Sequence, residues 1–185
     1  MRSMTAVLVL GFAFLSPNLL PAQNDNPMHS FVPGSSADSR LAREVRHELV
    51  MLPYYSIFDD LGFRVDGSTV TLVGNVVRPT LKSGAENVVK RIEGVSQVVN
   101  KINVLPLSNM DNQIRFAVAR AIYGDPIIGD RYGNRALPSI HVIVNNGHVT
   151  LEGVVANQGD KNLINIRANG VPNVFSVDNR LKVAS

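Results

Sequence analysis

The stretch Val70-Thr71-Leu72-Val73-Gly74-Asn75-Val76 decides the fold, because it returns almost unchanged as Val149-Thr150-Leu151-Glu152-Gly153-Val154-Val155. A second pair of matching segments follows at the same distance in each half. It consists of Val95, Val98, Asn100 and Val104, and then of Val174, Val177, Asn179 and Val183. Such self-similarity at a fixed spacing is typical of an internal repeat. The chain therefore contains two copies of one structural unit.

Each copy begins with a predicted helix. Apolar residues recur at helical spacing, at Leu41, Val45, Leu49 and Leu52 in the first copy and at Ile114, Val118 and Ile122 in the second. Asp38 or Ser39 can cap the first of these helices, and Pro53 ends it. The second copy has a longer connection between this helix and its first strand. We expect the two small copies to pack on each other or to share a partner.

A hairpin, a second helix and a last strand follow in each copy. Gly67-Ser68 and Asn146-Gly147 are suited to two-residue turns, and Asn-Gly favours type I′. The second turn places Ile140, Val142, Val144, Val149 and Leu151 on one sheet face. The other face is mostly polar, with His141 opposite Glu152 in a solvated pair. A helix is expected over 79–92. The pattern predicts an α+β protein of two tandem αββαβ repeats, each a three-stranded mixed sheet with two helices on one face.

Four residues of the repeated motifs have a predicted structural role. They are Gly74, Gly153, Asn100 and Asn179. A glycine inside a strand indicates a bulge or a place where a helix approaches closely.

The N-terminal segment resembles an export signal. Its apolar core, Ala6–Leu15, is shorter than the roughly 20 residues that span a bilayer, and Ala22 precedes a plausible cleavage site. We interpret residues 1–22 as a signal peptide, with an uncleaved anchor as the alternative. Residues 23–37 form a polar lead-in, 38–105 the first domain and 110–183 the second. A periplasmic or otherwise exported location follows.

The element order and both motifs resemble the BON domain. Both copies carry V-T-L-x-G-x-V after the turn and V-x-x-V-x-N-x-[ILV]-x-V at the end, so the resemblance covers 38–183. It implies an exported, non-enzymatic envelope protein that binds phospholipid surfaces, in envelope or osmotic stress maintenance. A protein-interaction or chaperone-like module that binds envelope proteins is the alternative. The chain has no cysteine, which distinguishes it from the lipoprotein members of the family.

The second copy carries the predicted lipid-binding surface, on helix 111–123 and loop 124–138. Apolar and tyrosine side chains beside arginines are suited to an anionic membrane interface, and the attachment would be weak and salt-sensitive. The predicted set is Arg115, Arg120, Ile127, Ile128, Arg131, Tyr132 and Arg135. The alternative is that Ile127, Ile128 and Tyr132 fold back over the sheet edge or the junction between the copies.

Other function classes find little support. Without cysteine there is no disulfide, thiol nucleophile or Cys-ligated zinc, and the four histidines do not gather into a metal site. No glycine-rich loop connects a strand to a helix, so no phosphate loop is present. The net charge of +3 is too small to indicate nucleic acid. We therefore predict no catalytic residue, metal or cofactor, and the sequence leaves the oligomeric state open.

Overall fold

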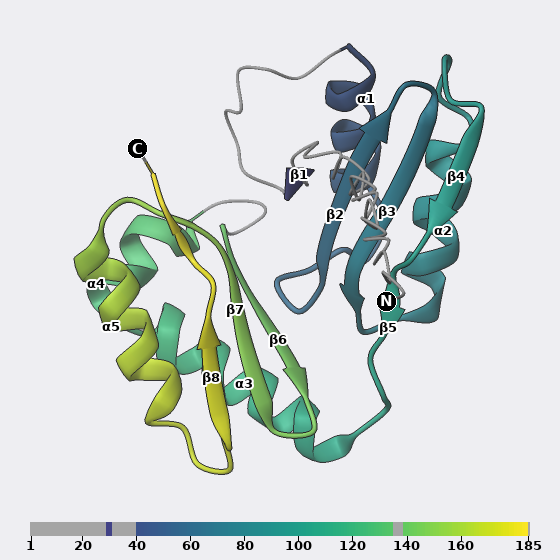
Figure 1. The fold of residues 1–185 in the computed structure, drawn as a ribbon. Helices are drawn as coiled ribbons and strands as arrows, with labels where there is room; N and C mark the ends of the chain where they lie inside the picture. Colours follow the sequence, from purple (N-terminus) through teal and green to yellow (C-terminus); the bar gives the residue numbers. More distant parts are fainter. Residues whose placement is uncertain (1–28, 31–39, 135–138, 185) are drawn as a thin grey trace, which may run out of the picture.

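The computed structural model describes residues 29–30, 40–134 and 139–184 and contains two αβ units (Figure 1). The first has β1 (His29–Ser30), α1 (Arg40–Val50), β2 (Asp60–Asp66), β3 (Thr69–Val76), α2 (Pro79–Val89), β4 (Gln97–Asn100) and β5 (Asn103–Val104). The second has α3 (Asn109–Tyr123), α4 (Pro126–Ile128), a π-helical turn η1 (Gly129–Gly133), β6 (Ile140–Asn145), β7 (His148–Val155), α5 (Gln158–Asn169), β8 (Ser176–Asn179) and β9 (Lys182–Val183). The predicted α+β tandem repeat is confirmed.

Each unit has a mixed sheet in which three strand positions lie side by side. In the first, β3 pairs antiparallel with β2 and parallel with β4 and β5, which are two parts of one interrupted strand. In the second, β7 has the same relation to β6 and to β8 and β9. The short strand β1 adds to the free edge of β2. Two helices cover one face of each sheet (Figure 1).

The hairpin turn of the second unit has the predicted type I′ geometry. Asn146 and Gly147 both have positive φ, at 51° and 78°. The buried carboxylate of Asp111, in the first turn of α3, accepts hydrogen bonds from both of their backbone N–H groups at 2.9 Å. The turn is therefore fixed to the helix layer as well as by its own backbone preference.

Each unit buries its own apolar core between helices and sheet. In the first, the apolar side chains of α1, β2 and β3 point inward. On α2, Val89 is buried and Val88 is only partly buried. In the second, the face predicted from the hairpin register is fully buried. Burial of these side chains is the main favourable contribution to the stability of each unit.

The motif glycines allow two strands to approach closely. A Cβ on Gly74 would lie 2.0 Å from the Asp60 carbonyl oxygen, and one on Gly153 would lie 1.9 Å from that of Ser139. Their φ angles of 120° and 128° are also unfavourable for other residues. The element that approaches is the neighbouring strand backbone, not the helix that the sequence suggested.

The motif asparagines join the last strand to the crossover helix. Asn100 Nδ2 donates to Lys82 O at 2.9 Å, and its Oδ1 accepts from the Ile102 N–H at 3.1 Å. Asn179 makes the same two contacts, with Lys161 O at 3.0 Å and the Leu181 N–H at 3.2 Å. Each asparagine therefore satisfies backbone groups where the strand is interrupted.

Several predictions fall outside the described residues. These are the signal peptide over 1–22, the helix cap at Asp38 or Ser39, and Arg135. In the part of the chain that the structure describes, no helix combines the length and apolar character needed to cross a bilayer.

Candidate functional site: the helix face of the second repeat

Arg115 of the predicted lipid-binding set lies inside the second unit. Its side chain is 2% exposed, and the guanidinium donates to Val144 O at 2.7 Å and to Asn112 Oδ1 at 2.6 Å. Burial lowers the pKa of Arg115 below its ordinary value, against the opposing effect of Asp111 and Asp59. Arg115 thus connects α3 to the end of β6, and its side chain is too buried to contact a membrane.

Ile128 and Tyr132 also point inward. Ile128 is part of the apolar core, and the Tyr132 hydroxyl donates to Asp160 and accepts from the Ala156 N–H at 2.8 Å. Both residues fold back, as in the sequence-based alternative, but into the core of the second unit, and Ile127 does not follow them. Although burial alone would raise the pKa of Asp160, hydrogen bonds from Tyr132 and Arg131 lower it.

Two members of the set remain on the surface without such ties. Ile127 of α4 is exposed, and Arg120 lies exposed in the last turn of α3. Among the described residues, the Arg120 side chain has no ion-pair or hydrogen-bond partner. Among the described cations of the predicted set, Arg120 is therefore the one available to an external anion.

A groove runs between α3 and α5 beside Arg120. Its volume is about 570 Å³, and it is lined by Ala117, Arg120, Ala121, Ile166, Arg167, Gly170, Val171 and Pro172. Ala117 and Ala121 on α3 and Gly170 just after α5 leave the space open. Phe116, one helical turn before Arg120, is 61% exposed, and Ile166 is 65% exposed. The groove thus has large apolar side chains beside a cation.

The helices α3 and α5 carry no exposed carboxylate. The acidic residues of α3 and α5 are Asp111 and Asp160, and both are buried. Arg167 is held by Asp125, with Nε and Nη2 at 3.0 and 2.7 Å from Oδ2. These bonds are the main reason why the pKa of Asp125 lies below its ordinary value. Exposed charge on the two helices is therefore positive.

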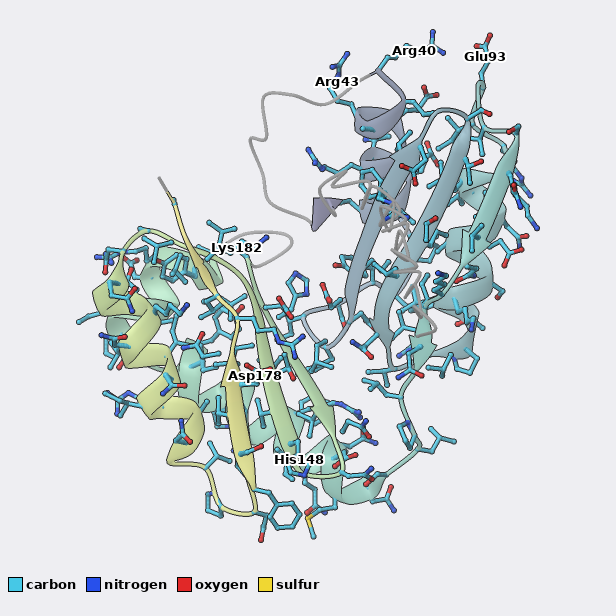
Figure 2. All side chains as sticks on the ribbon, in the orientation of Figure 1. Arg40, Arg43, Glu93, His148, Asp178 and Lys182 are labelled. Atoms are coloured by element: carbon cyan, nitrogen blue, oxygen red, sulfur yellow. The ribbon has the colours of Figure 1, made fainter. Side chains whose placement is uncertain are left out.

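The matching layer of the first unit is different. On α1 and α2, basic and acidic side chains pair with each other, as in Arg40 with Glu44 at 3.7 Å and Lys90 with Glu86 at 2.5 Å. Arg40 also reaches Glu93 at 3.3 Å, at the end of the unit where Figure 2 shows both. Exposed charges in this layer therefore partly neutralise each other.

The polar face of the second sheet needs a correction. His141 does face Glu152 in the predicted register, but His141 is 6% exposed, so the pair is not solvated. Residues of the first unit cover this ring. His148 lies exposed at the other end of β7, where its Nδ1 and Ser176 Oγ are 2.7 Å apart (Figure 2). In the described residues, no three acidic or histidine side chains gather as metal ligands.

Sequence reasoning missed Phe116 and Ile166. Both are large apolar residues that lie off the inward stripe of their helices, which runs through Ile114 and Val118 in α3 and through Ile164 and Ala168 in α5. An apolar residue out of phase with the stripe is the signal that could have found them.

The fold defines an α+β protein built as a tandem repeat. Comparison with known families makes the assignment specific. The BON domain matches residues 37–106 and again residues 111–185, so the chain belongs to the BON domain family. BON domains are envelope-associated binding domains that act on membranes or proteins.

Among solved structures, two of CdsD are similar to this chain. CdsD is a structural protein of the type III secretion system of Chlamydia trachomatis. Its C-terminal domain is 12% identical, covers 80% of this chain and 99% of its own, and has a TM-score of 0.33. A second CdsD structure is 12% identical, covers 78% and 92%, and has a TM-score of 0.32. No curated protein sequence matches this chain.

Proposed function

We propose that the protein is an exported, non-enzymatic envelope protein that binds anionic phospholipid surfaces reversibly through the α3–α5 face. The observation that carries the proposal is the combination of exposed Phe116 and Ile166 with unpaired Arg120 on two helices, α3 and α5, whose own carboxylates are buried. Of the sequence-based set, Arg120 and Ile127 belong to this surface. The same BON membership supports a role in envelope or osmotic stress maintenance.

The chemistry of the face is suited to the boundary between lipid headgroups and acyl chains. Aromatic and aliphatic side chains gain free energy by leaving water there, while an arginine near an anionic surface contributes about 1 kcal/mol. Few cations take part, so the attachment is weak and is reversed by salt. Ile127 lies just after Asp125, the partner of Arg167, and so extends the apolar surface beyond the end of α3.

Vesicle co-sedimentation of residues 23–185 tests the proposal. We expect pelleting with phosphatidylglycerol vesicles at low salt, little with phosphatidylcholine vesicles, and release at raised salt. Arg120→Glu replaces attraction with repulsion and should weaken binding about tenfold to thirtyfold. Phe116→Ser should weaken it through loss of apolar contact.

Arg91→Glu is the matched control, since it makes the same change of charge on the first unit, at an exposed position just after α2. Equal losses for Arg120→Glu and Arg91→Glu would show that only net charge matters. Pelleting that is independent of lipid charge and of salt would exclude the proposed face.

Protein binding is the second candidate. In the described part of the chain, β4 and β8 each pair with a neighbour on one side, which leaves a strand edge for an extended segment of another protein. This function predicts a partner recovered by crosslinking in the envelope, and binding that Arg120→Glu does not change.

A further inference from the structure

The two repeats meet through the loop that connects α1 to β2. This loop crosses to the edge strand of the second sheet, where the Val142 N–H donates to Ile57 O at 2.7 Å. Beside it, the ring of Phe58 packs edge-on against Phe116 of α3, with centroids 5.2 Å apart. Phe58 also contacts the core of the second repeat. The junction is thus a defined contact of backbone and apolar groups.

A buried histidine lies in the middle of this contact. His141 precedes Val142 on β6, and its ring centroid lies 5.7 Å from that of Tyr55 in the same loop. The ring hydrogen-bonds to the backbone at Asp59 and Ser56. Its Nδ1 is buried and has no hydrogen-bond partner among the described residues. The loop therefore encloses a neutral imidazole that has one nitrogen unpaired.

We propose that the junction between the repeats is a proton-sensitive contact, closed while His141 is neutral and opened when Nδ1 takes up a proton. A proton on Nδ1 would create a cation at a site that is closed to water and offers no acceptor to that nitrogen. Separation of the loop from β6 exposes the ring to water, which solvates the charge. Protonation therefore favours the open arrangement.

The direction of the pH dependence follows from the histidine. Burial lowers the pKa of His141 in the closed form, while the exposed ring of the open form has an ordinary pKa near 6.5. Above that value both forms are neutral and the junction is at full strength. As the pH falls below it, the open form binds a proton that the closed form excludes, so the equilibrium moves toward opening.

The other groups around the ring act at lower pH or in the opposite direction. Asp60 on β2 attracts the imidazolium, as does Asp59 more weakly, and Tyr55 stays neutral because burial raises its pKa. Glu152 faces the ring from β7 and is paired with Arg180 at 3.5 Å. Burial raises the pKa of both Asp60 and Glu152, so their protonation favours the closed form. As the pH falls further, protonation of these carboxyls in the closed form therefore opposes opening.

The buried histidine of the junction has no counterpart at the matching position of the first repeat. The position that matches His141 in the first repeat is Gly62 on β2, which pairs with Ser30 of β1 and has no group to titrate. Protonation thus acts on the contact between the repeats and leaves the equivalent edge of the first repeat unchanged.

Distance measurement between spin labels tests the proposal. The chain has no cysteine, so Asn87→Cys on α2 and Asn169→Cys on α5 label one site in each repeat of the full chain. Between about pH 7.5 and about pH 5.5, the ratio of the longer to the shorter distance should rise by up to about tenfold. Far-UV circular dichroism should stay constant, since both repeats remain folded.

Two variants separate the histidine from general acid effects. His141→Phe keeps an aromatic ring beside Tyr55 but cannot take up a proton, so its distances should not respond to pH. Asp60→Asn removes the main attraction for the imidazolium in the closed form, so opening should be more complete at the acid end of this range. An unchanged distance distribution in the original protein, or the same response in His141→Phe, would overturn the proposal. Neither result depends on lipid.

Discussion

The helix layers of the two repeats differ in charge and polarity, although their folds correspond element by element. On α1 and α2, exposed cations pair with carboxylates of the same layer. On α3 and α5 the carboxylates are buried, and Phe116 and Ile166 are exposed beside Arg120. Packing constrains only the inward stripe of a helix, so a duplicated fold can keep its core while the outward positions acquire another function.

The largest loss of stability is expected at the two motif glycines, where both repeats need the same backbone geometry. Gly153→Ala places a Cβ against the Ser139 carbonyl at an unfavourable φ, and Gly74→Ala does the same against Asp60. Each should cost about 3 kcal/mol or more in unfolding free energy, measured by urea denaturation. Gly67→Ala, where a Cβ would meet nothing, isolates the cost of positive φ. Equal losses at Gly67 and Gly153 would refute the close approach as the cause.

The next effect concerns a buried cation of the second repeat. Arg115 corresponds to Ala42 of α1, a buried residue with a small apolar side chain. Arg115→Met removes the bond to Val144 O and should cost about 2 kcal/mol in chemical denaturation. Arg120→Met, on the exposed side of the same helix, should leave stability unchanged. A similar loss in both variants would mean that Arg115 acts only through helix propensity.

The asparagines should have smaller and similar effects in the two repeats. Asn179→Ala breaks the contacts to Lys161 O and to the Leu181 N–H and should cost about 1 kcal/mol. Asn100→Ala should cost at least as much, since Asn100 also donates to Glu86 at 3.0 Å. Hydrogen exchange at Leu181 and Ile102 should rise in the respective variant only. Exchange that spreads over both repeats would show that the repeats unfold as one unit.

The smallest effect is expected at the paired surface of the first repeat. Glu93→Gln removes the carboxylate that Arg40 reaches, and both side chains are largely exposed. Exposed pairs contribute little to stability, so the thermal midpoint should not change measurably. The same variant should slightly strengthen pelleting with anionic vesicles, because the layer loses a negative charge. A clear loss of thermal stability would contradict the view that this layer is only a solvated surface.

Most of the fold could be predicted because its determinants are local. The type I′ turn depends on Asn146-Gly147, and the sheet register follows from alternation about that turn. Because the unit occurs twice, each element could be predicted independently in both copies. The identity of the element that approaches Gly74 was not predictable, since a glycine in a strand indicates a close approach without naming its source.

The candidate site was less predictable, because whether its side chains are buried or exposed depends on partners that are distant in the sequence. Tyr132 is a plausible membrane residue by type, but its hydroxyl is taken by Asp160, far along the chain. Arg115 lies next to Ile114 on the inward side of α3, and only the carbonyl of Val144 makes that position suitable for a cation. His141 is covered by a loop from the other repeat. No local pattern contains these partners.

The loop between the first helix and the first strand makes different contacts in the two repeats. In the first repeat it reaches forward, and Ile57 covers the free edge of the next sheet. The described part of the corresponding loop in the second repeat instead folds back, with Tyr132 and Arg131 held by Asp160 of its own α5. The same connection between first helix and first strand therefore has two uses. In the first repeat it joins the two units through the Ile57 carbonyl, and in the second its described residues brace that repeat's own α5.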